Sequence, residues 1–165
     1  MDYGTVRDKV AAHDDAISCM KLRGDVIVSG SWDSTVKCWQ MAEAAVVPLG
    51  RFRGISNHSE VKSIDLSAEG NLCVFGTANG AVHLSDQRAP GLQQSLKFHE
   101  NAIRGLTLSP DGRQFFTGCA DGIIKAVDIG TFTDSFSLNS QDQVICVPLL
   151  PAFPRLSPSR QRERG

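Results

Sequence analysis

The sequence lacks several features that would place it in common functional classes. It has no charge excess, because 17 basic and 18 acidic side chains leave a formal net charge of −1. Since binding to phosphates depends on clustered lysine and arginine, nucleic acid is not an expected partner. It contains no G-x-S-x-G, P-loop or H-E-x-x-H motif, so we expect neither an enzyme nor a bound cofactor.

Disulfides, zinc ligands and membrane spans are also unexpected. The five cysteines are odd in number and include no C-x-x-C pair, which favours free thiols over a disulfide framework or a metal centre. The first ten residues have no apolar core of the kind found in signal peptides. The apolar stretch CVPLLPAFP is short and broken by prolines, so no integral membrane segment is predicted. We therefore expect a cytoplasmic protein.

What the sequence does contain is an internal repeat. Three segments start with a histidine, at His13, His58 and His99, which stand 45 and 41 residues apart. In each segment a glycine is followed six residues later by a second glycine, and three residues after that by Asp33, Asn79 or Asp121. The glycine pairs are Gly24 and Gly30, Gly70 and Gly76, and Gly112 and Gly118. A register that is kept three times indicates a repeated structural unit.

Each copy is predicted to form four short antiparallel strands. Runs such as VIVSGS, LCVFGT and QFFTGC are bounded by tight turns, including the Asn-Gly and Asp-Gly kind, and helical periodicity is absent. Four strands in roughly 40 residues match one blade of a β-propeller. We therefore predict an all-β fold of about three four-stranded blades, at about residues 13–48, 58–94 and 99–138.

The quoted residues resemble the WD40 repeat family. In that family a histidine precedes the first strand, Ser or Thr lies in the second, Asp in the turn, and Trp-Asp closes the third. The matching residues are His13, Ser29 or Ser31, Asp33 and Trp39 in the first copy, His58 and Asn79 in the second, and His99, Thr117 and Asp121 in the third. The resemblance implies that they form buried hydrogen-bonded networks, which makes the histidines structural. The rival hypothesis, a metal site built from the three histidines, places its ligands in three different blades, so no metal is expected.

The repeat pattern ends after Val147. Residues 143–147 are typical of the first strand of a further blade, and residues 148–165, with four prolines and four arginines, are predicted to be a disordered tail. Residues 1–147 are thus assigned to WD40 repeats that form an incomplete propeller, whose open blade edges favour self-association. We interpret the chain as a fragment or truncated product. An arginine tail that binds an acidic ligand is the alternative.

Within the family, AHDD and SGSWDSTVKCW in one blade, followed by DGIIKAVDI in a later one, resemble the C-terminal propeller of the BEACH–WD40 proteins. That resemblance implies a non-enzymatic scaffold in protein-protein interactions. It further implies an adaptor that links a tumour necrosis factor receptor tail to neutral sphingomyelinase activation. A generic WD40 adaptor subunit of another complex is the alternative.

Acidic side chains cluster near the three histidines, and an indole lies beside the turn aspartate of the first copy. The residues concerned are Asp14, Asp15, Trp32, Glu60, Glu100 and Asn101. Because WD40 propellers place these two locations on one face, the resemblance implies an acidic rim beside an exposed aromatic side chain. Such a surface predicts a site for a basic, amphipathic peptide. The alternative is that the acids only hydrate the loops and that Trp32 packs against a neighbouring blade.

Overall fold

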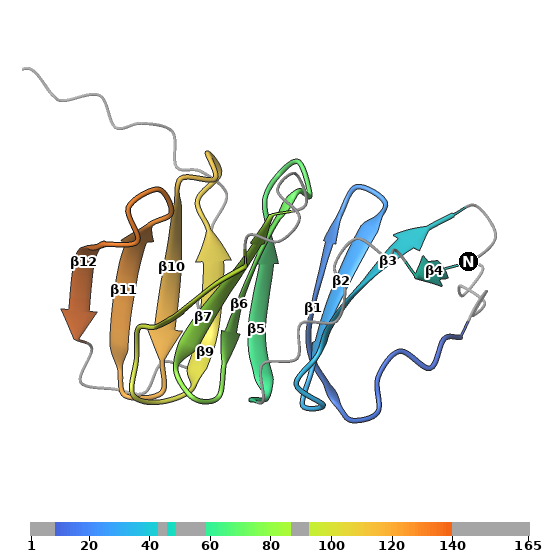
Figure 1. Cartoon of the computed structure of the whole chain (residues 1–165), viewed down its shortest axis with the longest axis horizontal. Coiled ribbons are helices and arrows are strands. Elements are labelled where there is room, and N and C mark those ends of the chain that lie inside the picture. The colour runs from blue at the N-terminus through green and yellow to red at the C-terminus, as the bar shows by residue number, and fades with distance from the viewer. Residues whose placement is uncertain (1–8, 43–45, 49–58, 87–92, 140–165) are drawn as a thin grey trace, which may run out of the picture.

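The computed structural model describes residues 9–42, 46–48, 59–86 and 93–139. Within these ranges the chain forms strands and no helix. The strands make three four-stranded antiparallel sheets in chain order, which we call blades 1, 2 and 3 (Figure 1). The predicted all-β fold with three four-stranded blades is thereby confirmed. His58, the predicted strand at 143–147 and the tail at 148–165 lie outside the described residues.

Each blade adds its strands in sequence, from the innermost to the outermost. Blade 1 consists of β1 (Ile17–Arg23), β2 (Val26–Ser31), β3 (Val36–Met41) and β4 (Val46–Pro48). Blade 2 consists of β5 (Val61–Leu66), β6 (Leu72–Thr77), β7 (Ala81–Asp86) and β8 (Gln93–Lys97). Blade 3 consists of β9 (Ile103–Leu108), β10 (Gln114–Cys119), β11 (Ile123–Asp128) and β12 (Asp134–Asn139). The inner strands contact one another, β1 with β5 and β5 with β9, so the blades pack as successive units (Figure 1).

The hairpin between the second and third strands of each blade needs one residue with positive φ. Blades 2 and 3 use Gly80 (φ 83°) and Gly122 (φ 85°), whereas blade 1 uses Ser34 (φ 67°). In all three blades the amide of this residue donates to the carbonyl three residues earlier. A side chain in this region costs about 1–2 kcal/mol, so the turn of blade 1 is formed against the local preference of its serine.

Two apolar cores hold the blades together. Between blades 1 and 2, Val28, Val36 and Cys38 pack with Val61, Ile64, Leu66, Cys73 and Phe75. Between blades 2 and 3, Leu72, Val74, Val82 and Leu84 pack with Ile103, Leu106, Leu108, Phe115 and Val127. Because side chains alternate along a strand, each blade has two distinct faces. We call the face that packs on the preceding blade its leading face, and the face that packs on the following blade its trailing face.

Glycines in the second strands make room for the next blade. A Cβ placed on Gly30 would lie 2.5 Å from Cγ1 of Val61, and one placed on Gly76 would lie 2.6 Å from Cγ2 of Ile103. Val61 and Ile103 are the first residues of β5 and β9 and are fully buried. Each junction therefore seats a β-branched side chain in the space that a second-strand glycine leaves open.

A buried carboxylate ties the three inner strands together. Asp65 of β5 is only 1% exposed, and its Oδ1 lies 3.1 Å from Nζ of Lys21 in β1. Its Oδ2 accepts hydrogen bonds from the Leu108 amide (2.9 Å) and the Thr107 hydroxyl (3.1 Å) of β9. The Leu66 amide donates to Oδ1 at 2.8 Å. Because both oxygens have charged or N–H partners, the buried charge is compensated and fixes blade 2 to both of its neighbours.

Candidate functional site

Blade 1 contains a continuous chain of buried polar side chains. The Trp39 indole N–H donates to the Ser29 hydroxyl oxygen at 2.9 Å, and that oxygen lies 2.7 Å from Nε2 of His13. On the other side of the ring, Nδ1 of His13 is 2.9 Å from Oδ2 of Asp33. The four side chains come from four places, namely the segment before β1, strand β2, strand β3, and the turn between β2 and β3. Their bonds thus connect the full width of the inner part of the blade.

The hydrogen-bond geometry assigns the protons in this chain. If Nδ1–H of His13 donates to the Asp33 carboxylate, Nε2 is free to accept the Ser29 O–H, and every member is paired. Burial opposes ionisation of Asp33, but bonds from the Thr35 side chain, the Asp14 amide and His13 outweigh it and hold the pKa of Asp33 well below its usual range. Thr35, whose hydroxyl lies 2.6 Å from Oδ1 of Asp33, was not predicted as a member. Its position two residues after Asp33 is the signal that could have indicated it.

The geometry distinguishes between the two serines that the sequence left open. Ser29 bonds to the imidazole and the indole, whereas the Ser31 hydroxyl donates to the Asp15 carbonyl (3.3 Å) and accepts from the Asp33 amide (3.1 Å). Ser31 thus shapes the turn, and Ser29 supplies the hydroxyl of the buried chain.

Blade 2 has a different arrangement at the same positions. Strand register places Phe75 level with Ser29, and the Phe75 ring stacks on His83 with ring centroids 4.8 Å apart. Asn79 accepts a hydrogen bond from the Thr77 hydroxyl (2.6 Å) and another from the Ala81 amide (3.2 Å), so it closes the hairpin turn. His58 is outside the described residues.

Blade 3 keeps part of the chain seen in blade 1. Nε2 of His99 lies 2.8 Å from the Thr117 hydroxyl, and Val127 fills the position of Trp39. The Asp121 carboxylate accepts from the Ile123 amide at 3.0 Å. Nδ1 of His99 has no hydrogen-bond partner among the residues that the structure describes. Burial lowers the pKa of His99, which favours the neutral ring.

His99, Cys119 and Asp121 also form a group with the atom types of a metal site, with ligand atoms within 4.8 Å of one another. The repeat gives these residues another explanation. Register places Cys119 level with Ser31, and its thiol donates to the Asn101 carbonyl (3.3 Å) as Ser31 donates to that of Asp15. Burial raises the pKa of the Cys119 thiol, which disfavours the thiolate that a metal requires.

The six predicted partner-binding residues lie along one edge of the blades, where the inner strands begin and the second-to-third-strand hairpins turn. A backbone bond joins these two places in every blade. In blade 1 the Trp32 amide donates to the Ala16 carbonyl. The corresponding bonds run from Ala78 to Glu60 in blade 2 and from Ala120 to Ala102 in blade 3. Asp15, Glu60 and Asn101 each stand two residues after a histidine, so the sequence predicts that they are equivalent. The same bonds correct this prediction, because they place Glu60 level with Ala16 rather than with Asp15. One residue fewer separates histidine and strand in the second copy, which repeat spacing alone could not reveal.

Trp32 is the most prominent feature of this edge. Its side chain is 46% exposed, and Nζ of Lys62 from blade 2 lies 4.5 Å from the ring centroid. Lys62 in turn pairs with Glu60 at 2.5 Å, while Asp14 and Asp15 are exposed beside the turn. We call these five residues the Trp32 patch. Lys62 was not predicted as a member, because its contact with Trp32 depends on the packing of blade 2 on blade 1.

Two of the acidic residues on this rim form ion pairs with lysines. Glu100 of blade 3 pairs with Lys97 at 2.7 Å, as Glu60 does with Lys62. Asn101 is exposed, and its carbonyl accepts the Cys119 thiol bond. Within the described ranges, the acidic residues of this rim that have no ion pair are therefore Asp14 and Asp15 of blade 1, next to Trp32.

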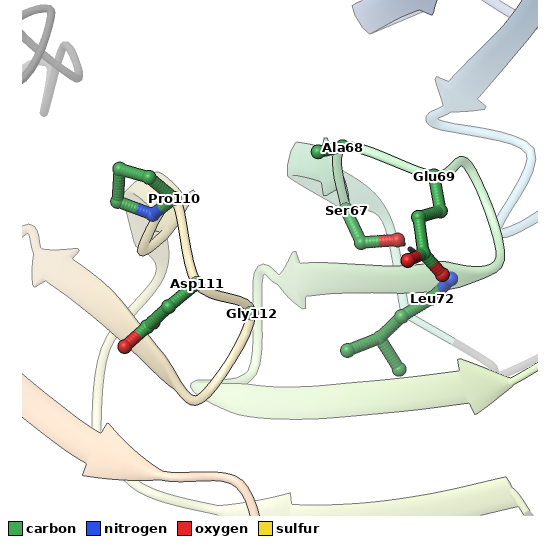
Figure 2. A pocket seen from close by; sticks show the side chains of 7 residues that line it. All are labelled: Ser67, Ala68, Glu69, Leu72, Pro110, Asp111 and Gly112. Carbon is green, nitrogen blue, oxygen red and sulfur yellow. Dashed lines mark hydrogen bonds between the residues drawn. The ribbon is translucent and has the colours of Figure 1, made fainter.

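The opposite edge carries a pocket between blades 2 and 3. Figure 2 shows that it lies between the β5–β6 turn and the β9–β10 turn, and its lining residues are Ser67, Ala68, Glu69, Leu72, Pro110, Asp111 and Gly112. Its polar groups already bond within the turns: Asp111 accepts from the Ser109 hydroxyl (2.6 Å) and from the Arg113 amide (3.1 Å). The pocket therefore offers no buried polar group in need of a ligand, and the Trp32 patch is the stronger candidate site.

Comparison with known proteins agrees with the fold and its repeats. The family described as "WD domain, G-beta repeat" matches residues 4–40 and 91–128. F-box/WD repeat-containing protein 9 of Homo sapiens is 32% identical over 76% of this chain, which spans only 25% of that protein. The structure of the computationally designed Ika4 protein matches with a TM-score of 0.73 and 26% identity, covering 90% of this chain and 89% of that one. The RRP9 WD40 repeats match with a TM-score of 0.69 and 18% identity, covering 82% of this chain and 42% of that one.

The chain therefore contains WD40 repeats, which form propeller blades. No helix in the described ranges is long and apolar enough to cross a membrane.

Proposed function

We propose that this chain is a non-enzymatic interaction scaffold whose Trp32 patch captures a basic segment of a partner protein. The half-exposed indole of Trp32 is the observation that carries the proposal. A large aromatic side chain on a rigid turn can contribute most of the binding energy of an interface. The turn is rigid because Asp33 next to it is held by the His13 imidazole and by Thr35.

The chemistry of the patch favours an arginine or lysine of the partner. A cation already sits over the Trp32 ring, which indicates that the ring face accepts positive charge. A partner arginine that displaces Lys62 could stack on the indole and approach the exposed carboxylates of Asp14 and Asp15. The released lysine keeps Glu60 as its counter-charge. Binding would thus exchange one cation for another without leaving a charge unpaired.

We propose further that the chain belongs to a cytoplasmic BEACH-type adaptor, that its partner is a tumour necrosis factor receptor tail, and that it acts in neutral sphingomyelinase activation. The quoted repeats AHDD, SGSWDSTVKCW and DGIIKAVDI support this assignment. A generic WD40 adaptor subunit is the second candidate, and similarity to an F-box/WD repeat protein favours it.

Isothermal titration of the full chain with a peptide from the receptor's cytoplasmic tail tests the proposal. Trp32→Ala should weaken binding about 30-fold, which corresponds to about 2 kcal/mol. Asp15→Lys combined with Glu60→Lys should weaken it mainly at low salt, since exposed charges are screened. Met41→Ala is the matched apolar control, because Met41 is 47% exposed at the opposite end of β3. Glu69→Lys, on the opposite edge, is the charge control.

The outcomes separate the candidates. Binding that survives all the patch variants in folded protein would remove the Trp32 patch as the site. Binding of an arginine-rich amphipathic peptide, but not of the receptor tail, would favour the generic adaptor. Binding that is steeply salt-dependent and disappears when residues 148–165 are deleted would favour the arginine tail instead.

A further inference from the structure

A second interaction surface, independent of the proposed peptide site, lies on the leading face of blade 1. Met20 and Leu22 of β1 are 62% and 51% exposed. Strand register gives them counterparts in the other blades, Ile64 and Leu66 in β5 and Leu106 and Leu108 in β9. All four counterparts are buried, because each leading face packs on the blade before it. Blade 1 therefore presents the apolar half of a blade junction.

The trailing face of blade 3 carries the complementary half. Its residues Phe116, Ile124 and Ala126 hold the register positions of Val28, Val36 and Cys38 in blade 1. On the outer strand, Phe136 and Leu138 pair with Ala126 and Ile124 and are about half exposed. Phe116 and Ile124 are partly exposed, whereas their blade 2 counterparts Val74 and Val82 are buried. The same apolar design thus continues to this end of the described blades.

The contact between the first residue of an inner strand and a glycine of the preceding blade also has its two halves at these ends. Ile17, 46% exposed at the start of β1, corresponds to Val61 and Ile103, which fit against Gly30 and Gly76. In blade 3 the corresponding glycine is Gly118. A junction between blade 3 of one copy and blade 1 of another would pair a β-branched side chain with a glycine, as the two internal junctions do.

We propose that two copies of this chain associate head to tail, with the leading face of blade 1 in one copy docked on the trailing face of blade 3 in the other. A second copy is the occupant because one chain presents both halves of the junction that it already uses twice internally. Two junctions would close a ring with twice the three described blades. Six blades lie within the range of about four to eight found in closed propellers. Each junction joins two different surfaces, and a two-fold axis relates the two junctions of the closed ring.

The association should be weaker than the internal junctions. At the internal junctions Asp65 bonds to Lys21 on one side and to Thr107 on the other. At the new junction Thr107 of one copy would face Lys21 of the other, and neither side chain supplies a carboxylate in the place of Asp65. The ring should therefore depend on protein concentration.

Sedimentation of four forms of the full chain tests this arrangement. The head variant carries Met20→Glu and Leu22→Glu, and the tail variant carries Phe136→Glu and Leu138→Glu. All four side chains are about half exposed or more, so the variants should fold, which a cooperative urea transition would verify. Leu96→Glu is the control, because Leu96 is also partly exposed (40%) but lies in β8 of blade 2.

We expect the wild type and the control to dimerise, and each double variant alone to have a dissociation constant raised at least about tenfold. Mixing the head and tail variants should restore a dimer, because one intact head then meets one intact tail. A wild type that stays monomeric at the highest attainable concentration would overturn the proposal. So would a tail variant that still dimerises, which indicates head-to-head contact, or a control that is weakened as much as the variants.

Discussion

Removal of the Ser29 hydroxyl is the most direct perturbation of the buried chain in blade 1. Ser29 is 2% exposed, and its oxygen joins Nε1 of Trp39 (2.9 Å) to Nε2 of His13 (2.7 Å). The substitution Ser29→Ala keeps the strand and its neighbours but deletes the bridging atom. It leaves one donor and one acceptor buried without a partner.

The expected cost follows from the number of groups left unpaired. An unsatisfied buried donor or acceptor costs about 1–3 kcal/mol, and Trp39 is buried deeply enough (8% exposed) that water does not readily replace the bond. Two such groups predict a loss of about 3 kcal/mol in the free energy of unfolding. Thr117→Val in blade 3 should cost less, about 1–2 kcal/mol, because within the described part of the chain His99 is the one side chain that bonds to that hydroxyl.

Urea unfolding followed by far-ultraviolet circular dichroism measures these changes, with constant m-values as the check on two-state behaviour. A double-mutant cycle isolates the Ser29–Trp39 bond, because Trp39→Phe removes the indole donor. In the Trp39→Phe background, Ser29→Ala should cost at least about 1 kcal/mol less than in the wild type.

Additivity in this cycle would refute the reasoning, since it would mean that the indole N–H and the hydroxyl do not interact. Ser31→Ala is the matched control, because among the described residues the Ser31 hydroxyl bonds to backbone groups alone, the Asp15 carbonyl and the Asp33 amide. Its cost should be unchanged by Trp39→Phe.

Three further predictions concern the blade junctions and pH. Asp65→Ala should lower the free energy of unfolding by about 3 kcal/mol or more, because it leaves buried amides of blades 2 and 3 without an acceptor; a urea midpoint equal to that of the wild type would contradict the clamp. Gly30→Ala should cost about 1–3 kcal/mol through overpacking, and much less in a Val61→Ala background; equal costs in the two backgrounds would exclude the fitted contact. Burial lowers the pKa of His83 and of His99, so below about pH 6.5 the unfolded chain binds more protons than the folded protein and the free energy of unfolding should fall. His83→Gln should make this fall between about pH 7 and pH 5.5 shallower, which urea midpoints at each pH would measure.

The regular part of the fold could be predicted from the sequence because glycine spacing and strand alternation act locally. A hairpin turn and a period of two are set by neighbouring residues, so three copies in register specify three sheets. The turn of blade 1 is the instructive exception. It is the same turn although Ser34 holds the place of glycine, because the flanking strands and the Asp33 bonds impose the geometry.

The details of the candidate site depend on contacts between blades, which spacing does not encode. The position of Lys62 over Trp32 needs the packing of blade 2 on blade 1, and no pattern within either copy specifies it. The position of Glu60, level with Ala16, is defined by the backbone bond from the Ala78 amide to the Glu60 carbonyl. The choice of Ser29 over Ser31 could not be made from strand alternation, because residues two apart share a face.

The three blades also differ in the side chains that fill the centre of the leading face, which are Ser29 in blade 1, Phe75 in blade 2 and Thr117 in blade 3. Blade 2 lies between two described blades, and it places Phe75 where blade 1 has Ser29. Phe75 is fully buried in the core that it shares with blade 1, so dispersion and apolar burial replace hydrogen bonds there. The leading face of blade 1 has no described blade in front of it, yet Ser29 is buried. The imidazole of His13 and the indole of Trp39, which bond to Ser29, provide that burial from within the blade. The polar chain is most complete in blade 1, where His13 and Trp39 both bond to Ser29.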